Sequence, residues 1–499
     1  MDARCGSKRK GGMGIRLSES GLDEPLWRMS EMSERVAGEF AWVELGDRRL
    51  NARVASVAAQ LSRSPAVAFP KVLTEAELSA YYRLVNHESV SFERLLEAHV
   101  EASKRRAEVL PRVIVAHDTS DFRFSDEVAR EGLGRMDNGG QGFYGHASVA
   151  FDEERRIVGT LAFEPWIRAP KDPDAIKRTQ KERYESTNNE SLRWMRAVHR
   201  TEKELAGTGA ALVHVMDREA DDYDILCELR SHSYQFVIRA STDRLLSPRH
   251  GGVKLKEFAR SLDVRIERSA QLAHRKKKRR PKERTKFPPR KLRDAHLSFS
   301  VGRVALRRPD IASKDLPAEL ELSLVHVWEL HPPEDGEPIE WFLLTDQPVG
   351  TEEQILRIVD DYRTRWGIEE FFKVLKTGCS IEKRQHESAH AMLNTLAIAL
   401  ALAWALMTLR HAARDARTQN LPATEVLNPR QLEILRVRSR GTLPANPTVE
   451  QTVLALARFF GGHLRGNGPP GWHVLGRAYE SLLLVEFGWW LATNAGAGV

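Results

Sequence analysis

The sequence predicts an α/β protein, with a core built on a β-sheet and helical regions before and after it. Two apolar segments that read as buried strands each end in an aspartate, at Asp118 and at Asp217. A segment near residue 360 has helical periodicity and gathers charged side chains on one face. Because carboxylates at strand ends are suitable oxygen ligands for divalent cations, this pattern predicts a metal site in the core.

Length and composition set the limits of this prediction. A chain of 499 residues has room for two to four domains. Its three cysteines, Cys5, Cys227 and Cys379, are far apart and form no CxxC pair, so neither a disulfide framework nor a cysteine zinc site is indicated. Without a secretory signal after the basic N-terminus, we expect a reducing, cytoplasmic location.

Positive charge is concentrated in one segment. The formal net charge is +7, yet residues 268–293 alone hold thirteen Lys and Arg against the single acid Glu283. This run lies in a stretch of short alternating segments, which we expect to be a β-rich insertion at about residues 241–340. A run of cations indicates contact with a polyanion through phosphates rather than bases.

The N-terminal part divides into two segments. Residues 1–34 are polar and are expected to be mobile. Residues 35–107 have helical apolar periodicity with basic edges, which suits a DNA-binding module but equally suits ordinary surface arginines. The candidate DNA contacts are Arg49, Arg53, Arg63 and Arg83.

The core is expected over residues 108–385. Its predicted strands are 112–119, the pair 145–151 and 157–163, then 210–217, 235–239 and 341–345, with a long polar helix at 182–205. We expect the first strand to end near Asp118. That end would leave Asp121 beyond the strand and make it a weaker metal candidate.

The helix near residue 360 carries a polar stripe about 80° wide at about 100° per residue. Its members are Tyr362, Arg365, Glu369, Lys373 and Lys376. The carboxylate suits Mg²⁺ or Mn²⁺, and the cations and phenol suit phosphate oxygens. Glu370 points about 100° away from this stripe and is rejected as a ligand. A solvated helix with i, i+4 ion pairs remains an alternative.

The C-terminal region, residues 386–499, is expected to be helical and to support dimerisation. Nineteen residues from Ala391 to Leu409 carry no charge, close to the length of a membrane span. Because alanine dominates and Asn394 interrupts the run, we expect a buried helix and no membrane partner. The apolar residues between Leu475 and Trp490 leave a wide surface for a second chain.

A second motif points to different chemistry. His386-Glu387-Ser388-Ala389-His390 spells the HExxH pattern of zinc metalloproteases. The extended pattern needs glycine and histidine where this chain has Leu393 and Leu396. The metalloprotease therefore stays a remote alternative.

Taken together, the motifs resemble those of insertion-sequence-four transposases, and especially the transposon-five type. The resemblance runs from about Phe40 to Phe487 and depends on the order of several short motifs. These are Leu45-Gly46-Asp47-Arg48-Arg49, Asp217-Arg218-Glu219-Ala220-Asp221, the Tyr-x2-Arg-x3-Glu-x6-Lys spacing from Tyr362 to Lys376, and Phe460-Gly461-Gly462 before Gly471-Trp472.

The resemblance implies a ribonuclease-H-like (retroviral integrase-like) core that performs cut-and-paste DNA transposition. It implies that Asp118, Asp217 and Glu369 are catalytic and bind two divalent ions, normally Mg²⁺. It further implies a homodimer acting on double-stranded DNA, inside a bacterial cytoplasm at the nucleoid. A catalytically inactive DNA-binding regulator is the alternative. The DNA contacts that it implies are Tyr362, Arg365 and Lys376, with Lys373, Arg239 and a base-stacking Trp341 as further candidates.

Overall fold

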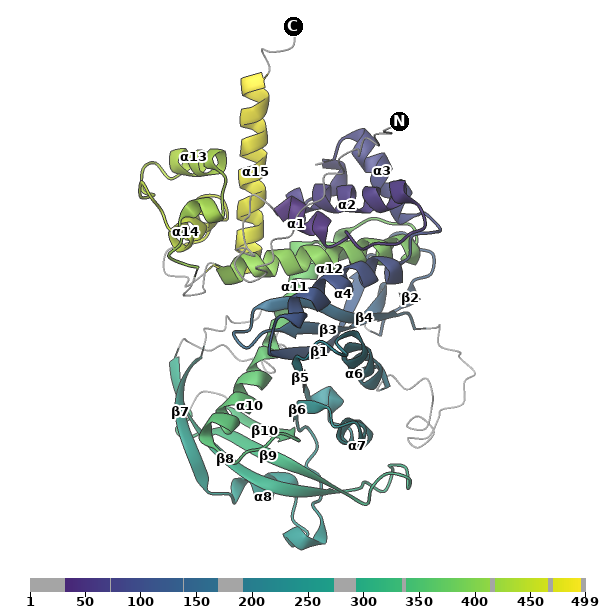
Figure 1. Ribbon diagram of the computed structural model, residues 1–499, viewed down its shortest axis with the longest axis vertical. Helices are drawn as coiled ribbons and strands as arrows, with labels where there is room; N and C mark the ends of the chain where they lie inside the picture. Colours follow the sequence, from purple (N-terminus) through teal and green to yellow (C-terminus); the bar gives the residue numbers. More distant parts are fainter. Residues whose placement is uncertain are drawn as a thin grey trace, which may run out of the picture.

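The computed structural model describes residues 32–71, 73–137, 139–168, 192–272, 293–333, 338–412, 418–464 and 470–494. The described strands form one mixed sheet, in the order β2-β3-β1-β5-β6-β10-β9-β8-β7, with β4 paired to β3. Helices cover this sheet and extend beyond one end of it (Figure 1). Most of the predicted basic run, residues 273–292, and the segment 1–31 lie outside the described residues.

Four helices form the N-terminal part: α1 (Met32–Gly38), α2 (Arg48–Arg63), α3 (Glu75–Val85) and α4 (Phe92–Glu108). Side chains fix where three of them begin, including α4, where the Ser91 hydroxyl accepts the N–H of Arg94. The Asp47 carboxylate accepts the first free N–H groups of α2, and Thr74 and Glu77 form a capping box at α3. Helix α4 packs on strand β4, so this part shares a core with the sheet.

The first half of the sheet consists of the strands β1 (Arg112–Phe124), β2 (Gly134–Arg135), β3 (Gln141–Phe151), β4 (Ile157–Trp166), β5 (Ala211–Met216) and β6 (Gln235–Arg239). Strands β1, β3 and β4 are antiparallel neighbours, whereas β5 and β6 run parallel to β1. Between them lie α6 (Leu192–Glu204), η3 (Arg218–Ala220) and α7 (Tyr223–Ser231). The expected helix at 182–205 is described only from Leu192.

The prediction that β1 ends near Asp118 is wrong. The strand continues to Phe124 because its second half pairs with β3, from Asp118↔Ala147 to Phe124↔Gln141. The parallel pairing with β5 stops at Ala116↔Val215. Asp118 therefore lies where β1 leaves its parallel neighbour, and Asp121 lies within the strand.

The insertion continues the same sheet. Strands β7 (Val264–Leu272), β8 (Arg293–Arg307) and β9 (Glu319–Glu329) are antiparallel, and β9 pairs with β10 (Glu340–Thr345). Strand β10 in turn pairs with β6. Short helices η4 (Pro248–His250) and α8 (Leu255–Arg260) precede β7. The β-rich character was expected, but its continuity with the core sheet was not.

The helix that carries the polar stripe is interrupted. It comprises α10 (Glu352–Thr364), α11 (Trp366–Lys373) and the π-helical turn η5 (Val374–Gly378), followed by η6 (Ile381–Lys383). A capping box of Thr351 and Gln354 starts α10. The π-helical turn changes the helical phase before Lys376, so the stripe does not continue unchanged to its end.

Helix α12 (Ala389–Ala412) is the central helix of the molecule. It packs against α4 and β4 on one side and against α1, α2, α3 and α15 on the other (Figure 1). Its window Ala389–Thr408 is long and apolar enough to span a membrane, but 89% of that window is buried inside the protein. The buried helix expected from the sequence is therefore what the fold contains.

The remaining helices are η7 (Ala423–Glu425), α13 (Pro429–Arg438), α14 (Val449–Phe459) and α15 (Trp472–Asn494). Helix α15 starts beside α14 and α13 and then extends away from the body (Figure 1). Leu475, Ala478, Tyr479 and Leu482 near its start are buried. Leu484, Val485, Phe487 and Trp489 near its end are exposed.

Candidate active site

Two of the three predicted acids are placed by neighbouring parallel strands. In the parallel register of β1 and β5, Ala116 pairs with Val215. Continuing that register by two residues places Asp118 beside Asp217. Backbone amides orient both carboxylates: Asp118 Oδ1 accepts the N–H of Thr119 at 2.7 Å, and Asp217 Oδ1 accepts the N–H of Glu219 at 2.8 Å. The strand-then-acid pattern thus places two carboxylates at one edge of the sheet.

The third acid, Glu369, arrives on α11. Ile368, Phe371 and Phe372 of this helix are buried against the sheet. A Cβ at Gly367 would come within 2.6 Å of the Phe151 ring, so glycine is required for α11 to approach β3 this closely. This close contact fixes how near α11, and with it Glu369, lies to the sheet that carries the aspartates.

The electrostatics of Asp118 show that the three acids interact. Burial raises the pKa of Asp118 to about 7, the nearby Asp217 carboxylate adds to the shift, and Glu369 adds less. The Arg365 guanidinium and the Thr119 amide act in the opposite direction. The three carboxylates lie close together, and nearby positive charge only partly balances them. Such carboxylates are suitable ligands for a divalent cation, so the residues present fit a metal.

Arg365 lies between the acids. Its Nη2 is 2.5 Å from Glu369 Oε1, and its Nη1 is 3.5 Å from Asp118 Oδ2. The Arg365 side chain is only 9% exposed, whereas that of Glu369 is 42% exposed. The buried guanidinium is thus positioned to neutralise both carboxylates and also to meet a phosphate at this edge.

Beside the acids lies an aromatic group. The Trp341 ring centroid is 5.5 Å from that of Tyr362 and 5.4 Å from that of Trp366. The Arg239 guanidinium lies 5.9 Å from the centre of the Trp341 ring. Trp366 is 40% exposed and Trp341 is half-buried, so together they offer a partly open aromatic surface next to Glu369.

Tyr362 differs from its sequence-based prediction. The stripe was expected to face a cleft, yet Tyr362 is only 1% exposed. Burial raises the pKa of Tyr362, and Arg365 and Arg239 partly oppose that shift. Its hydroxyl is therefore near the cations of the site but under the protein surface.

The two lysines of the stripe separate. Lys376, in the π-helical turn, lies with its Nζ 3.1 Å from Asp121 Oδ1, whereas Lys373 is exposed on α11. Asp121 is also paired with Arg123. Burial acts to raise the pKa of Asp121, but these two cations outweigh that effect and lower the pKa. Asp121 is therefore engaged in ion pairs rather than available as a metal ligand.

The sequence did not indicate the contacts of two residues near the site. Arg193 of α6 donates through Nε to Thr119 Oγ1 at 3.1 Å, next to Asp118, and its guanidinium lies over the Trp166 ring. Asp221 of the Asp217–Asp221 motif is buried and pairs with Arg244. Asp221 thus anchors the chain after β6, while Asp217 faces the other acids.

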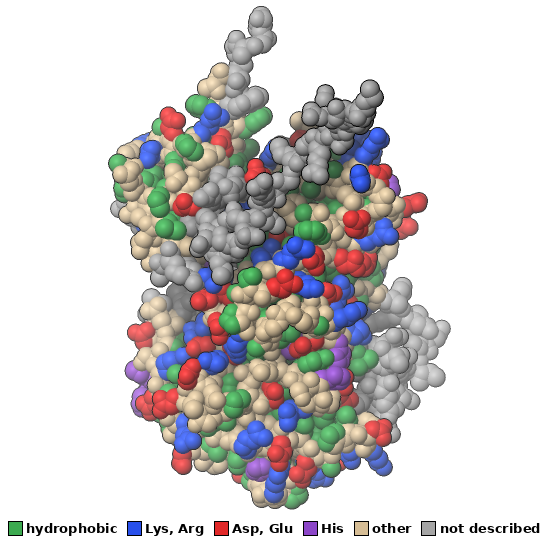
Figure 2. Space-filling model, viewed as in Figure 1, with side chains coloured by type: hydrophobic (Ala, Val, Ile, Leu, Met, Phe, Trp, Pro, Cys, Tyr) green, Lys and Arg blue, Asp and Glu red, His purple; other side chains and the backbone are tan. Residues whose placement is uncertain are grey.

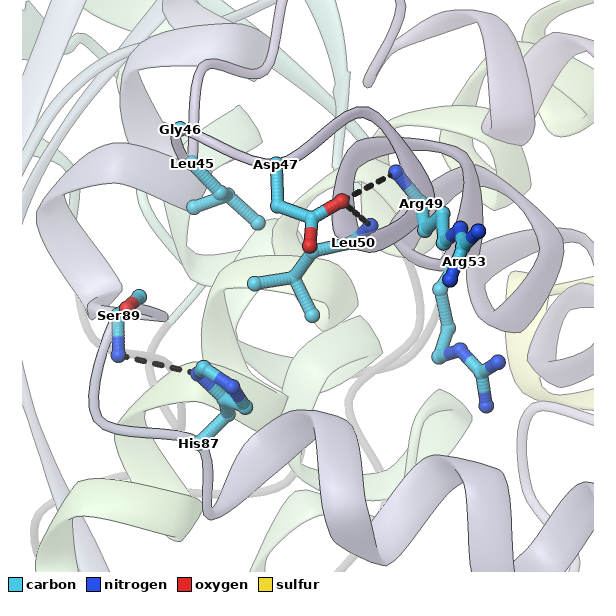
Figure 3. A pocket seen from close by; sticks show the side chains of 8 residues that line it. All are labelled: Leu45, Gly46, Asp47, Arg49, Leu50, Arg53, His87 and Ser89. Carbon is cyan, nitrogen blue, oxygen red and sulfur yellow. Dashed lines mark hydrogen bonds between the residues drawn. The ribbon is translucent and has the colours of Figure 1, made fainter.

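The N-terminal arginines lie on another surface. A hollow of about 470 Å³ is lined by Leu45, Gly46, Asp47, Arg49, Leu50, Arg53, His87 and Ser89 (Figure 3). Arg63 and Arg83 are also exposed but do not line this hollow. On the face drawn in Figure 2, Lys and Arg side chains are interspersed with Asp and Glu, so positive charge there is local rather than continuous.

The HExxH segment does not form the helix that a zinc protease requires. His386 precedes α12, is buried, and has its Nε2 2.9 Å from the Tyr81 hydroxyl. His390 lies in the first turn of α12 and contacts the His87 carbonyl. The two imidazoles therefore do not share one helical face, and the metalloprotease hypothesis has no geometric support.

Comparison with known families agrees with this geometry. Residues 189–406 match the family described as "Transposase DDE domain", whose fold is in general ribonuclease-H-like, and residues 32–90 match "Transposase DNA-binding". The mixed α/β sheet thus carries a DDE domain. The chain is a DDE-type transposase that joins a DNA-binding domain to a DDE domain. The DDE domain implies dependence on a divalent metal. Asp118 precedes the matched segment and is placed at the site by β1.

Proposed function

We propose that this chain is a cut-and-paste DNA transposase of the insertion-sequence-four family, transposon-five type. It would bind the ends of its element, cleave them and join their 3′ ends to target DNA. The observation that carries the proposal is the meeting of Asp118, Asp217 and Glu369 at one edge of the sheet, with the raised pKa of Asp118. Glu369 rather than Glu370 is the third acid because it shares Arg365 with Asp118.

Each acid has a role in the proposed chemistry. Asp118, Asp217 and Glu369 would hold two divalent ions, Mg²⁺ or Mn²⁺. Such ions would activate water or a 3′-hydroxyl and stabilise the leaving oxygen of a phosphodiester. The Thr119 and Glu219 amides keep the two aspartates oriented for this task. No side chain needs to form a covalent intermediate.

Three groups of residues would contact DNA. Arg365, Lys373 and Lys376 would hold phosphates near the acids, and Tyr362 would do so only if its environment opens. Trp341, supported by Arg239 and Trp366, would stack on a base that leaves the duplex. In the N-terminal module the exposed Arg49 and Arg53 would contact the element end, with Arg63 and Arg83 at its margin.

The proposal includes a homodimer that holds two DNA ends. It also includes an intracellular setting at the bacterial nucleoid, where its DNA partner is found. The apolar end of α15 supports the dimer, because the side chains of Leu484 and Phe487 are exposed to solvent and a second chain could bury them.

The test is cleavage of labelled DNA that carries candidate element ends. Purified protein with Mg²⁺ should nick and then release the ends, and chelation should stop the reaction while end binding persists. An inactive regulator would bind the same DNA in a gel-shift assay without cleaving it under Mg²⁺ or Mn²⁺. That second result would remove the catalytic proposal and leave the DNA-binding role.

A further inference from the structure

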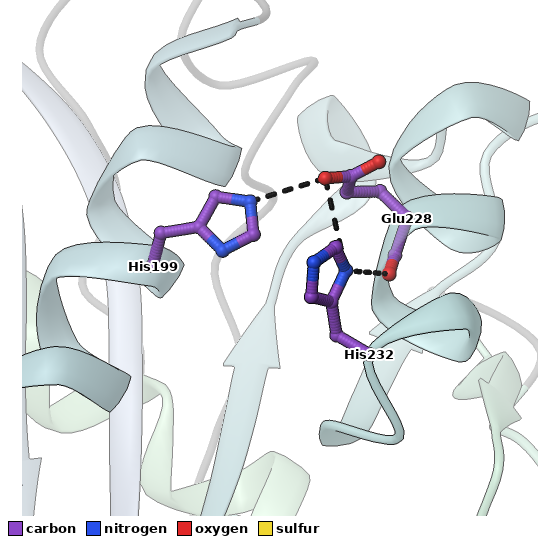
Figure 4. Close-up of side chains that lie close together, drawn as sticks. All are labelled: His199, Glu228 and His232. Carbon is purple, nitrogen blue, oxygen red and sulfur yellow. Dashed lines mark hydrogen bonds and ion pairs between the residues drawn. The ribbon is translucent and has the colours of Figure 1, made fainter. Parts of the chain in front are cut away.

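A second group of metal-ligating side chains lies away from the acids. His199 comes from α6, and Glu228 and His232 come from the end of α7 (Figure 4). One ligand atom of each lies within 4.8 Å of the others. His199 Nε2 is 3.1 Å from Glu228 Oε1, and His232 Nδ1 is 3.7 Å from the same oxygen. We propose that these three residues form a zinc site distinct from the catalytic acids.

The spacing suits zinc in particular. Tetrahedral zinc, with bonds of about 2.0–2.2 Å to nitrogen and oxygen, holds its ligand atoms about 3.3–3.5 Å apart. The two distances to Glu228 Oε1 bracket that value, so small side-chain rotations would form the site. Two imidazoles and a carboxylate make a donor set typical of Zn²⁺. The side chains are 38%, 43% and 44% exposed, which leaves room for water as the fourth ligand.

Neighbouring groups already orient both imidazoles. His199 Nδ1 is 3.4 Å from the Tyr234 hydroxyl, so its Nε2 is directed to the centre of the group. The His232 ring stacks on Tyr234, with centroids 5.2 Å apart and planes 21° apart. Its Nδ1 is also 3.1 Å from the Glu228 carbonyl, a hydrogen bond that zinc would replace. Outer contacts of this kind fix ring orientation in metal sites.

The site lies at the opposite edge of the sheet from the acids. Asp217 follows the carboxyl end of β5, whereas His232 comes shortly before the amino end of the parallel strand β6. Zinc there would join α6, which precedes the β5–Asp217 segment, to α7, which follows it after η3. Its role would be to hold these helices together, and it would take no part in DNA cleavage. Without zinc, the three side chains form an ordinary histidine–glutamate contact group, with His199 Nε2 3.1 Å from Glu228 Oε1.

The experiment uses the full chain, treated with chelator and then freed of it. Zinc chloride is titrated by calorimetry in excess Mg²⁺, and Co²⁺ absorption reports tetrahedral coordination. The test variants are His199→Ala, Glu228→Gln and His232→Ala, and the matched control is His331→Ala, an exposed histidine on the loop after β9. A triple variant, Asp118→Asn/Asp217→Asn/Glu369→Gln, removes the catalytic acids.

We expect one zinc per chain in the wild type, the His331 control and the triple variant. Each of the three test variants should bind zinc at least tenfold more weakly and lose the rise in thermal unfolding temperature that zinc gives. Equal unfolding temperatures of these variants and the wild type without zinc would show that they fold. Absence of zinc binding by the wild type, or wild-type affinity in all three variants, would overturn the proposal. Loss in the triple variant alone would place the zinc at the catalytic acids and would also overturn it.

Discussion

Arg365 is bound to Glu369 one helical turn later, with 2.5 Å between Nη2 and Oε1. The same guanidinium reaches Asp118 at 3.5 Å, so one buried cation balances charge on acids from two different elements. Divalent cations at the acids would take over this neutralisation. Arg365 would then be available for a phosphate oxygen, which links metal binding to DNA binding at this edge of the sheet.

The first prediction concerns the three acids. Asp118→Asn, Asp217→Asn and Glu369→Gln should each lower strand cleavage by at least a thousandfold, because each removes an anionic oxygen ligand at nearly constant shape. End binding, measured by gel shift, should change less than threefold. Glu370→Gln is the matched control and should cleave within about fivefold of the wild type. Near-normal cleavage by the Glu369→Gln protein would remove that residue from the site.

The second prediction concerns Arg365. Arg365→Lys keeps the charge but loses the planar pair of donors that contacts Asp118 and Glu369 together. We expect cleavage to fall about a hundredfold, with a smaller loss of end binding. Arg363→Lys, two residues earlier and paired with Asp360, is the control. Equal cleavage by both variants would show that charge alone is needed at position 365.

Local sequence signals located several strands of the core sheet. Runs such as residues 112–119 and 211–217 are apolar because both faces of a central strand are buried, and the aspartates after them mark where burial ends. The sequence could not show that β1 continues to Phe124, because that half is supported by pairing with β3 rather than by its own composition. Its Asp121 and Arg123 are tolerated there as an ion pair.

The parts of the site that were missed depend on contacts between distant segments. Helical phase predicted that Tyr362, Glu369 and Lys376 share an exposed face, but the π-helical turn redirects Lys376 and Tyr362 is buried. Arg193 is distant in sequence from Asp118 and comes close only because α6 packs on β3 and β4. Periodicity cannot encode such contacts.

The third prediction tests how α11 is positioned. Gly367→Ala should destabilise the protein by about 1–3 kcal/mol, because the new Cβ would meet the Phe151 ring at 2.6 Å and α11 would have to shift. Cleavage should fall as well, since Glu369 moves with the helix. Gly488→Ala on α15 meets nothing within 4 Å and should be neutral or slightly stabilising. Thermal unfolding and cleavage rates of the two variants give the comparison.

The fourth prediction concerns the ion pair that joins Glu39, just after α1, to Arg106 of α4. Burial acts to raise the pKa of Glu39, but Arg106 and His99 outweigh it and lower that pKa to about 2. A lowered acid pKa contributes stability above its ordinary value of 4.5, and this contribution is lost as the pH falls towards 2. Glu39→Gln should therefore destabilise the protein at pH 7 by about 3 kcal/mol, because the part-buried Arg106 guanidinium loses its carboxylate partner.

Unfolding temperatures measured from pH 7 to pH 3 would check this. The difference between wild type and Glu39→Gln should shrink as the pH falls below 4.5. The exposed Glu34→Gln, in helix α1, is the control and should follow the wild type throughout. A constant difference across the pH range would mean that the Glu39 side chain acts through packing rather than charge.

The last prediction concerns the outer half of α15. Leu475, Ala478, Tyr479 and Leu482 are buried against the rest of the chain, so removing the whole of α15 would also damage the fold. Leu484→Ser/Phe487→Ser changes only side chains that are 55% and 58% exposed. We expect a stable protein that binds a single DNA end normally, because the N-terminal module is untouched, but forms paired-end complexes at least tenfold less. Double-end cleavage should fall in parallel.

The control is Val437→Ser, which replaces a 75% exposed residue at the end of α13. Light scattering and gel shifts with two ends would separate the outcomes: undiminished pairing by the Leu484/Phe487 variant would place the dimer contact on another surface.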